Sequence, residues 1–74
     1  GGIMVEVGNL CWDTLTKTIW VIKEIWWCPI WEDYKYDLMN VKDLMVITTN
    51  EAVAIHMRAD FLKRTKFVLD KFEE

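Results

Sequence analysis

Apolar residues recur at helical spacing in the last third of the chain. At 100° per residue, one broad face of residues 51–74 carries Val53, Ala54, Met57, Phe61, Val68, Leu69 and Phe72, and the opposite face carries His56, Asp60, Lys63, Lys66 and Asp70. Residue types that favour helices dominate this stretch. Thr48 or Thr49 can cap its start, and Thr48-x-x-Glu51 matches a capping box. We therefore predict an amphipathic helix of about six turns.

Residues 14–27 have a different character, because Thr, Ile, Val and Trp dominate them. β-Branched and aromatic residues fit a pleated sheet, so we predict one long strand here. A helix over residues 12–27 is the alternative, since a helical stripe also accommodates Trp12, Leu15, Ile19, Ile22 and Trp26.

Shorter alternating runs predict three more strands, over residues 3–7, 34–39 and 44–48, with turns at Gly8-Asn9, after Pro29 and at Asn40. The 74 residues thus predict a single α+β domain, a four-stranded antiparallel sheet with one long C-terminal helix packed on it. A β-α-β-β-α order is the runner-up, and a three-helix bundle is the third possibility.

A single helix can cover only one face of such a sheet. Strict alternation along residues 14–27 places Trp20, Ile22 and Trp26 on one face with three threonines, and Leu15, Ile19, Val21 and Ile25 on the other. An open face with two tryptophans is too apolar to be left to water without a reason. It indicates a dimer, a ligand surface, or unselected exposure in an artificial sequence.

Composition favours the artificial origin. The chain has no Ser and no Gln but five Trp, and 53% of its residues are hydrophobic. A sequence selected by an energy function on a fixed backbone has this bias; a viral genome with strong mutational bias is the alternative. We expect a designed, stable domain without evolved catalytic activity.

No catalytic, cofactor or metal site is predicted, so we expect no enzyme. His56 is the single histidine, and the sequence has no Gly-rich loop and no serine nucleophile. For Cys11 and Cys28 we predict two buried free thiols, with a disulfide between them as the alternative. The most apolar stretch, residues 19–31, is interrupted by Lys23, Glu24 and Pro29, which argues against a membrane segment. With no targeting signal in view, we expect a cytoplasmic protein.

One pattern points to binding. Aromatic residues alternate with lysines between residues 17 and 36, and stacking platforms combined with cations on a sheet hold single-stranded nucleic acid in many proteins. The net charge of −3 gives no long-range attraction to phosphate, so a homodimer through this aromatic face is the other candidate, and Phe67 on the polar side of the helix fits a subunit contact. The candidate face comprises Lys17, Trp20, Lys23, Trp26, Tyr34 and Tyr36.

Two segments resemble a known family. Ile30-Trp-Glu-Asp-Tyr-Lys-Tyr-Asp-Leu38 and Met45-Val-Ile-Thr-Thr-Asn-Glu-Ala52 are similar to the third strand, and to the fourth strand and helix start, of the positive-cofactor family of transcriptional coactivators and its bacterial relatives. The resemblance extends over residues 15–62 and implies a dimer that binds single-stranded DNA on its sheets. The sequence departs from the family in having few basic residues along the strands. It also has residues 40–43 where the family has a Gly-rich approach to the fourth strand.

Overall fold

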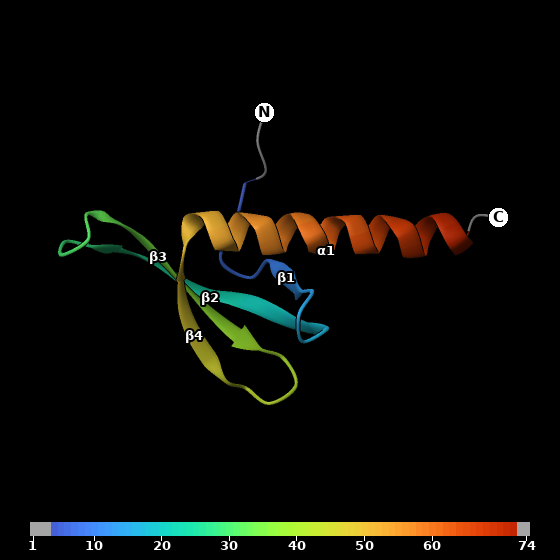
Figure 1. Ribbon diagram of the computed structural model, residues 1–74, viewed down its shortest axis with the longest axis horizontal. Helices are drawn as coiled ribbons and strands as arrows, with labels where there is room; N and C mark the ends of the chain where they lie inside the picture. Colours follow the sequence, from blue (N-terminus) through green and yellow to red (C-terminus); the bar gives the residue numbers. More distant parts are fainter. Residues whose placement is uncertain (1–3, 73–74) are drawn as a thin grey trace.

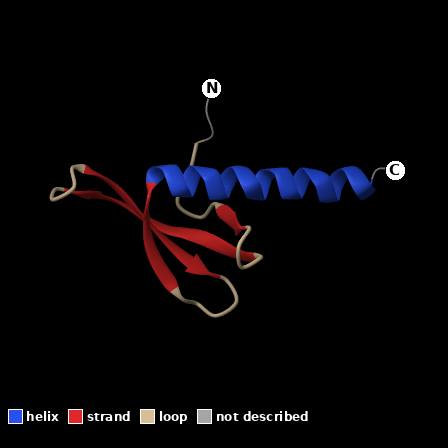
Figure 2. Cartoon of the chain, in the orientation of Figure 1, coloured by secondary structure: helices blue, strands red, loops and turns tan. Residues whose placement is uncertain are grey.

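Four strands and one long helix make up residues 4–72, the part of the chain that the computed structural model describes. The strands form one antiparallel sheet in the order β1-β2-β3-β4, and α1 lies along one side of it (Figures 1 and 2). The elements are β1 (Leu10–Asp13), β2 (Thr18–Cys28), β3 (Asp33–Asn40), β4 (Val46–Asn50) and α1 (Glu51–Phe72). The predicted α+β class and the β-β-β-β-α order are confirmed.

The beginning of the sheet differs from the prediction. Residues 4–7 are not a strand, and residue 3 lies outside the described residues. The first strand, β1, instead lies between the predicted turn at Gly8-Asn9 and the predicted long strand, in residues assigned to neither. The predicted long strand is confirmed from Thr18 to Trp27, and the alternative helix over residues 12–27 is wrong. Residues 14–17 are not part of the strand, because Asp13 stabilises a turn there. Its carboxylate accepts hydrogen bonds from the Leu15 amide at 2.9 Å and the Thr16 hydroxyl at 2.8 Å. Lys17, at φ 57°, completes the reversal into β2.

A β-bulge lies in the middle of β2. Ile22 pairs with Leu38, but the next paired residue is Glu24, opposite Asp37, so Lys23 is an extra residue in the ladder. One extra residue reverses the alternation of all side chains that follow it.

The bulge overturns the predicted open face. Trp20 lies on the side of β2 that faces α1, and beyond the bulge that side continues with Ile25 and Trp27. Trp26 lies on the opposite side, where it is paired with Lys35. The prediction that Trp20 and Trp26 share a face is therefore wrong, because strict alternation does not hold through Lys23.

Helix α1 begins one residue later than a Thr49 cap requires and two residues later than a Thr48 cap requires. Asn50 accepts a hydrogen bond from the Val53 amide at 2.9 Å and is the N-cap. Thr48 belongs to β4, where its hydroxyl donates to Asp37 at 2.8 Å. The predicted threonine cap is wrong because pairing with β3 holds Thr48 and Thr49 in an extended strand.

The core lies between the first half of α1 and the nearest part of the sheet. Cys11 and Leu38 are fully buried, and the Cys11 thiol contacts the Ala54 carbonyl at 4.0 Å. Both cysteines are buried free thiols, as predicted. The buried cluster consists of Cys11, Trp20, Ile22, Tyr36, Leu38 and Ala54, with Val5, Ile25 and Met57 packed around it.

Helix α1 lies mainly against the edge strand β1. Arg58 donates to the Leu10 carbonyl at 3.0 Å, and the Arg64 guanidinium stacks 4.0 Å from the centroid of the Trp12 ring. Beyond these contacts the second half of α1 extends past the ends of the strands (Figure 1). The sheet therefore covers the first half of the helix much better than the second.

Candidate interaction surfaces

The six residues of the predicted binding face do not form one surface. Trp20 and Tyr36 are in the core, with only 7% and 5% of their surface exposed, so their rings are not available for stacking on a ligand. Lys17 lies in the β1–β2 turn, far along β2 from the hairpin that β2 forms with β3. Of the remaining three, Lys23 is at the bulge, and Trp26 and Tyr34 lie on opposite sides of the sheet.

An exposed aromatic group does exist at the end of the β2–β3 hairpin. We define the hairpin aromatic cluster as Trp26, Trp27, Trp31 and Tyr34, all of which are exposed, with Trp26 on one side of the sheet and Trp27 and Tyr34 on the other. Trp27 and Tyr34 pack edge to face with their centroids 5.2 Å apart, and Lys35 lies 5.8 Å from the centroid of the Trp31 ring. The predicted face omits Trp27, because only the bulge brings Trp27 to the side of Tyr34. It also omits Trp31, which lies in the β2–β3 turn.

Acidic side chains surround this cluster. Trp26 donates its indole N–H to Asp37 at 3.2 Å, and Asp33 pairs with Lys35 at 3.5 Å. Glu24 and Glu32 are exposed and belong to neither of the two ion pairs found within residues 4–72. The hairpin is thus aromatic and acidic, which is unfavourable for binding a phosphate backbone.

A second exposed apolar surface is on the helix. We define the helix overhang as residues 62–71 of α1; its exposed apolar side chains are Leu62, Phe67, Val68 and Leu69. Leu62, Val68 and Leu69 lie on or beside the helical face that, about two to four turns earlier, carries buried Ala54. The apolar face of α1 therefore continues beyond the sheet that covers its first half.

The overhang is basic as well as apolar. Lys63, Arg64, Lys66 and Lys71 are all exposed, and Asp70 is the one acidic residue among residues 62–71. Lys66 follows Leu62 by four residues and precedes Leu69 by three, so it shares their strip of the helix. Arg64 is engaged with Trp12, and Lys71 lies over Phe67 at 5.5 Å.

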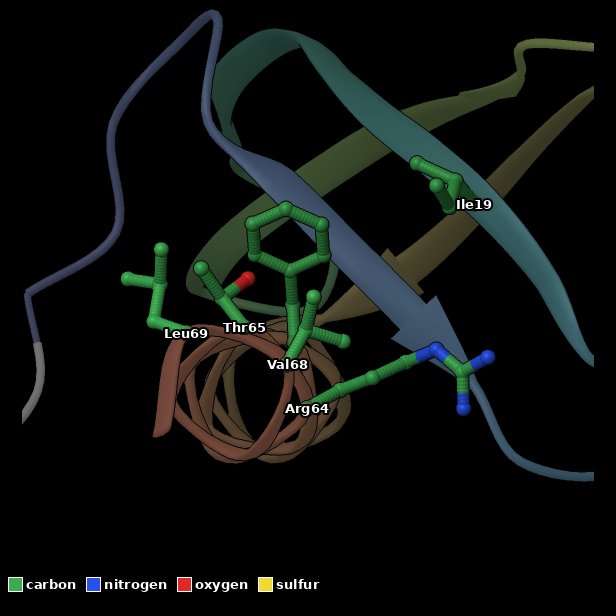
Figure 3. A pocket seen from close by; sticks show the side chains of 6 residues that line it. Ile19, Arg64, Thr65, Val68 and Leu69 are labelled. Atoms are coloured by element: carbon green, nitrogen blue, oxygen red, sulfur yellow. The ribbon is translucent and has the colours of Figure 1, made fainter. Parts of the chain in front are cut away.

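A shallow pocket of about 210 Å³ lies where the overhang leaves the sheet. It is lined by Ile19, Phe61, Arg64, Thr65, Val68 and Leu69. Figure 3 looks nearly along α1 and shows Thr65 and Val68 on the side of the helix that faces the strands, with Ile19 coming from β2. This lining is almost entirely apolar, which suits an apolar side chain more than a polar ligand.

The histidine, the cysteines and the acidic residues described by the structure do not form a recognisable catalytic or metal-binding arrangement. His56 projects outward from α1 and lies 3.7 Å from Asp60. Among residues 4–72 no three side chains of His, Cys, Asp or Glu gather closely enough to hold a metal ion. Burial raises the pKa of the Cys11 thiol, an effect opposite to the activation of a nucleophilic cysteine.

Within residues 4–72, no helix combines the length and apolar character that a bilayer span requires. No family model, curated protein or solved structure matches this sequence.

Proposed function

We propose that this chain is a protein-interaction domain that self-associates, with the helix overhang as its main contact surface. The observation that carries the proposal is the continuation of the core-facing side of α1 beyond its own sheet. Fully burying an exposed aliphatic side chain of this size stabilises a structure by about 1.5–3 kcal/mol. Since Leu62, Val68 and Leu69 are 41%, 44% and 56% exposed, covering each of them contributes roughly half of that to association.

Self-association accounts for the exposed apolar residues better than nucleic-acid binding does. Single-stranded nucleic acid needs aromatic rings and cations on one surface. The aromatic rings gather on the acidic hairpin, whereas the cations gather on the helix overhang. A designed domain without evolved activity makes a different prediction, an inert monomer at all concentrations.

Sedimentation equilibrium over roughly 1–200 µM, the range of weak specific dimers, tests the proposal. We expect a concentration-dependent dimer for the wild-type chain and a monomer for the double variant Leu62→Glu/Leu69→Glu. The matched control is Leu15→Glu, because Leu15 is 92% exposed in the β1–β2 turn, away from the overhang. Circular dichroism of each variant shows whether the fold is retained.

A wild-type chain that stays monomeric at every concentration would overturn the proposal and favour the inert designed domain. Saturable quenching of Trp fluorescence by mixed-sequence single-stranded DNA, weakening with salt, would favour the nucleic-acid module instead. Dimerisation that survives both overhang substitutions would also count against the overhang as the contact surface.

A further inference from the structure

Resting on the proposed self-association, we infer that the helix overhang of each molecule docks on the β2–β3 hairpin of a second copy, so that two chains pack antiparallel and form the same contact twice. Both surfaces expose apolar side chains, and they lie at opposite ends of the molecule along its longest axis of 50 Å (Figure 1).

The charges of the two surfaces are complementary. The overhang carries Lys63 and Lys66, which belong to neither ion pair within residues 4–72. The hairpin carries Glu24 and Glu32, which are likewise exposed and outside those pairs. Opposite charges at the rim of an interface steer association and fix its register.

The same charges argue against the simplest alternative, in which two overhangs pack on each other. Such a contact would place two sets of lysines side by side, and juxtaposed like charges are unfavourable. Docking on the hairpin instead brings Lys66 to the acidic rim and places Leu62 and Leu69 against exposed rings. Aromatic rings accept both apolar and cationic neighbours, so they suit a surface of this mixed character.

The positions of the two surfaces also determine the symmetry. A contact between two different patches closes into a two-fold dimer only if both patches can pair at once. Because the overhang and the hairpin lie at opposite ends of one elongated molecule, an antiparallel neighbour pairs both of them. Glu24 and Trp26 share one side of the hairpin, whereas Trp27 lies on the other. The two equal contacts together therefore bury Trp26 and Trp31, which are 37% and 73% exposed in the single chain.

Charge reversal tests the arrangement in the full chain. The helix variant is Lys63→Glu/Lys66→Glu, the hairpin variant is Glu24→Lys/Glu32→Lys, and a third chain carries all four substitutions. We expect each double variant to weaken the dimer at least about tenfold, and the four substitutions together to restore most of the loss. Lys17→Glu/Lys42→Glu is the control, because it changes the net charge as the helix variant does but outside both surfaces.

The outcomes separate this inference from the proposed function. A wild-type chain without dimer removes both. A dimer that is weakened by the helix variant, is unaffected by the hairpin variant and is not restored in the four-substitution chain overturns the inference alone, and points to contact between two overhangs. Association that grows into long polymers also overturns it, because the contact then does not close.

Discussion

The two halves of α1 have the same amphipathic pattern and opposite surroundings. In the first half, Ala54 is fully buried and Met57 packs against the core; in the second, Val68 and Leu69 are 44% and 56% exposed. Their positions around the helix differ little, so periodicity alone does not distinguish them. The difference shows that an amphipathic pattern identifies the face of a helix that is suited to burial, but not what covers that face.

The largest expected effect comes from the covered region. Trp20→Ala should lower the free energy of unfolding by about 3–5 kcal/mol, because it leaves a cavity under the first half of α1. Trp26→Ala is the control, since the Trp26 side chain is 37% exposed and lies on the other side of the sheet. This variant should lower the free energy of unfolding by about 1 kcal/mol, because it removes the hydrogen bond from Trp26 to Asp37. Urea unfolding measures both variants. Equal losses would show that Trp20 is not part of the core.

An intermediate effect concerns pH. Burial raises the pKa of the Cys11 thiol, and burial followed by the charge of Glu51 raises the pKa of the Tyr36 hydroxyl. Since the folded state holds these protons more tightly, their contribution to stability is complete below the unfolded pKa values. This contribution to the free energy of unfolding is lost as the pH rises from about 8.5 through the pKa values of the folded state. Each of the two groups accounts for a loss of at most about 1.4 kcal/mol per pH unit.

Urea unfolding of the wild type, Tyr36→Phe and Tyr34→Phe between neutral and alkaline pH checks this sign. The decline of stability at high pH should be shallower for Tyr36→Phe, which has no hydroxyl to ionise, than for Tyr34→Phe, which removes only the smallest of the three causes that raise the Tyr36 pKa. Identical declines in all three chains would contradict a titrating Tyr36 in the covered region.

The smallest expected effect concerns the overhang. In a dilute, monomeric sample Leu69→Ala should change the free energy of unfolding by less than about 0.5 kcal/mol, since Leu69 already faces solvent. Met57→Ala, one residue on the covered half of the same face, should cost about 2 kcal/mol. If Leu69→Ala lowered the free energy of unfolding as much as Met57→Ala at the same low concentration, the sheet would not cover the two halves of α1 differently.

Much of the architecture follows from local patterns. The helix over residues 51–72 is predicted from its residue types and periodicity, and Tyr36 and Leu38 on one side of β3 follow from alternation. The position of β1 does not follow from local patterns. The few residues around Asp13 can form a strand, an irregular segment or a turn with little difference in intrinsic backbone preference. The carboxylate of Asp13 and the positive φ of Lys17 settle that region once β1 and β2 are paired.

The candidate site is much less predictable than the fold. An inserted residue such as Lys23 leaves no mark in the hydrophobic pattern, yet it moves Trp26 away from Trp20 and brings Trp27 to the side of Tyr34. A binding surface inferred from alternation therefore mixes core and exposed rings. The sequence places Leu62, Lys66 and Phe67 on the predicted helix, but it does not show that they are exposed. Their exposure depends on where the sheet ends.

The sequence by itself determined the α+β class, three of the four strands and the amphipathic helix, because side-chain type and spacing act over a few residues. The tertiary structure alone decided the bulge, the burial of Trp20, the Asn50 cap, and the length of α1 that the sheet covers. These depend on strand register and strand length, which are set by pairing between distant segments. No local pattern of hydrophobic and polar residues records that pairing.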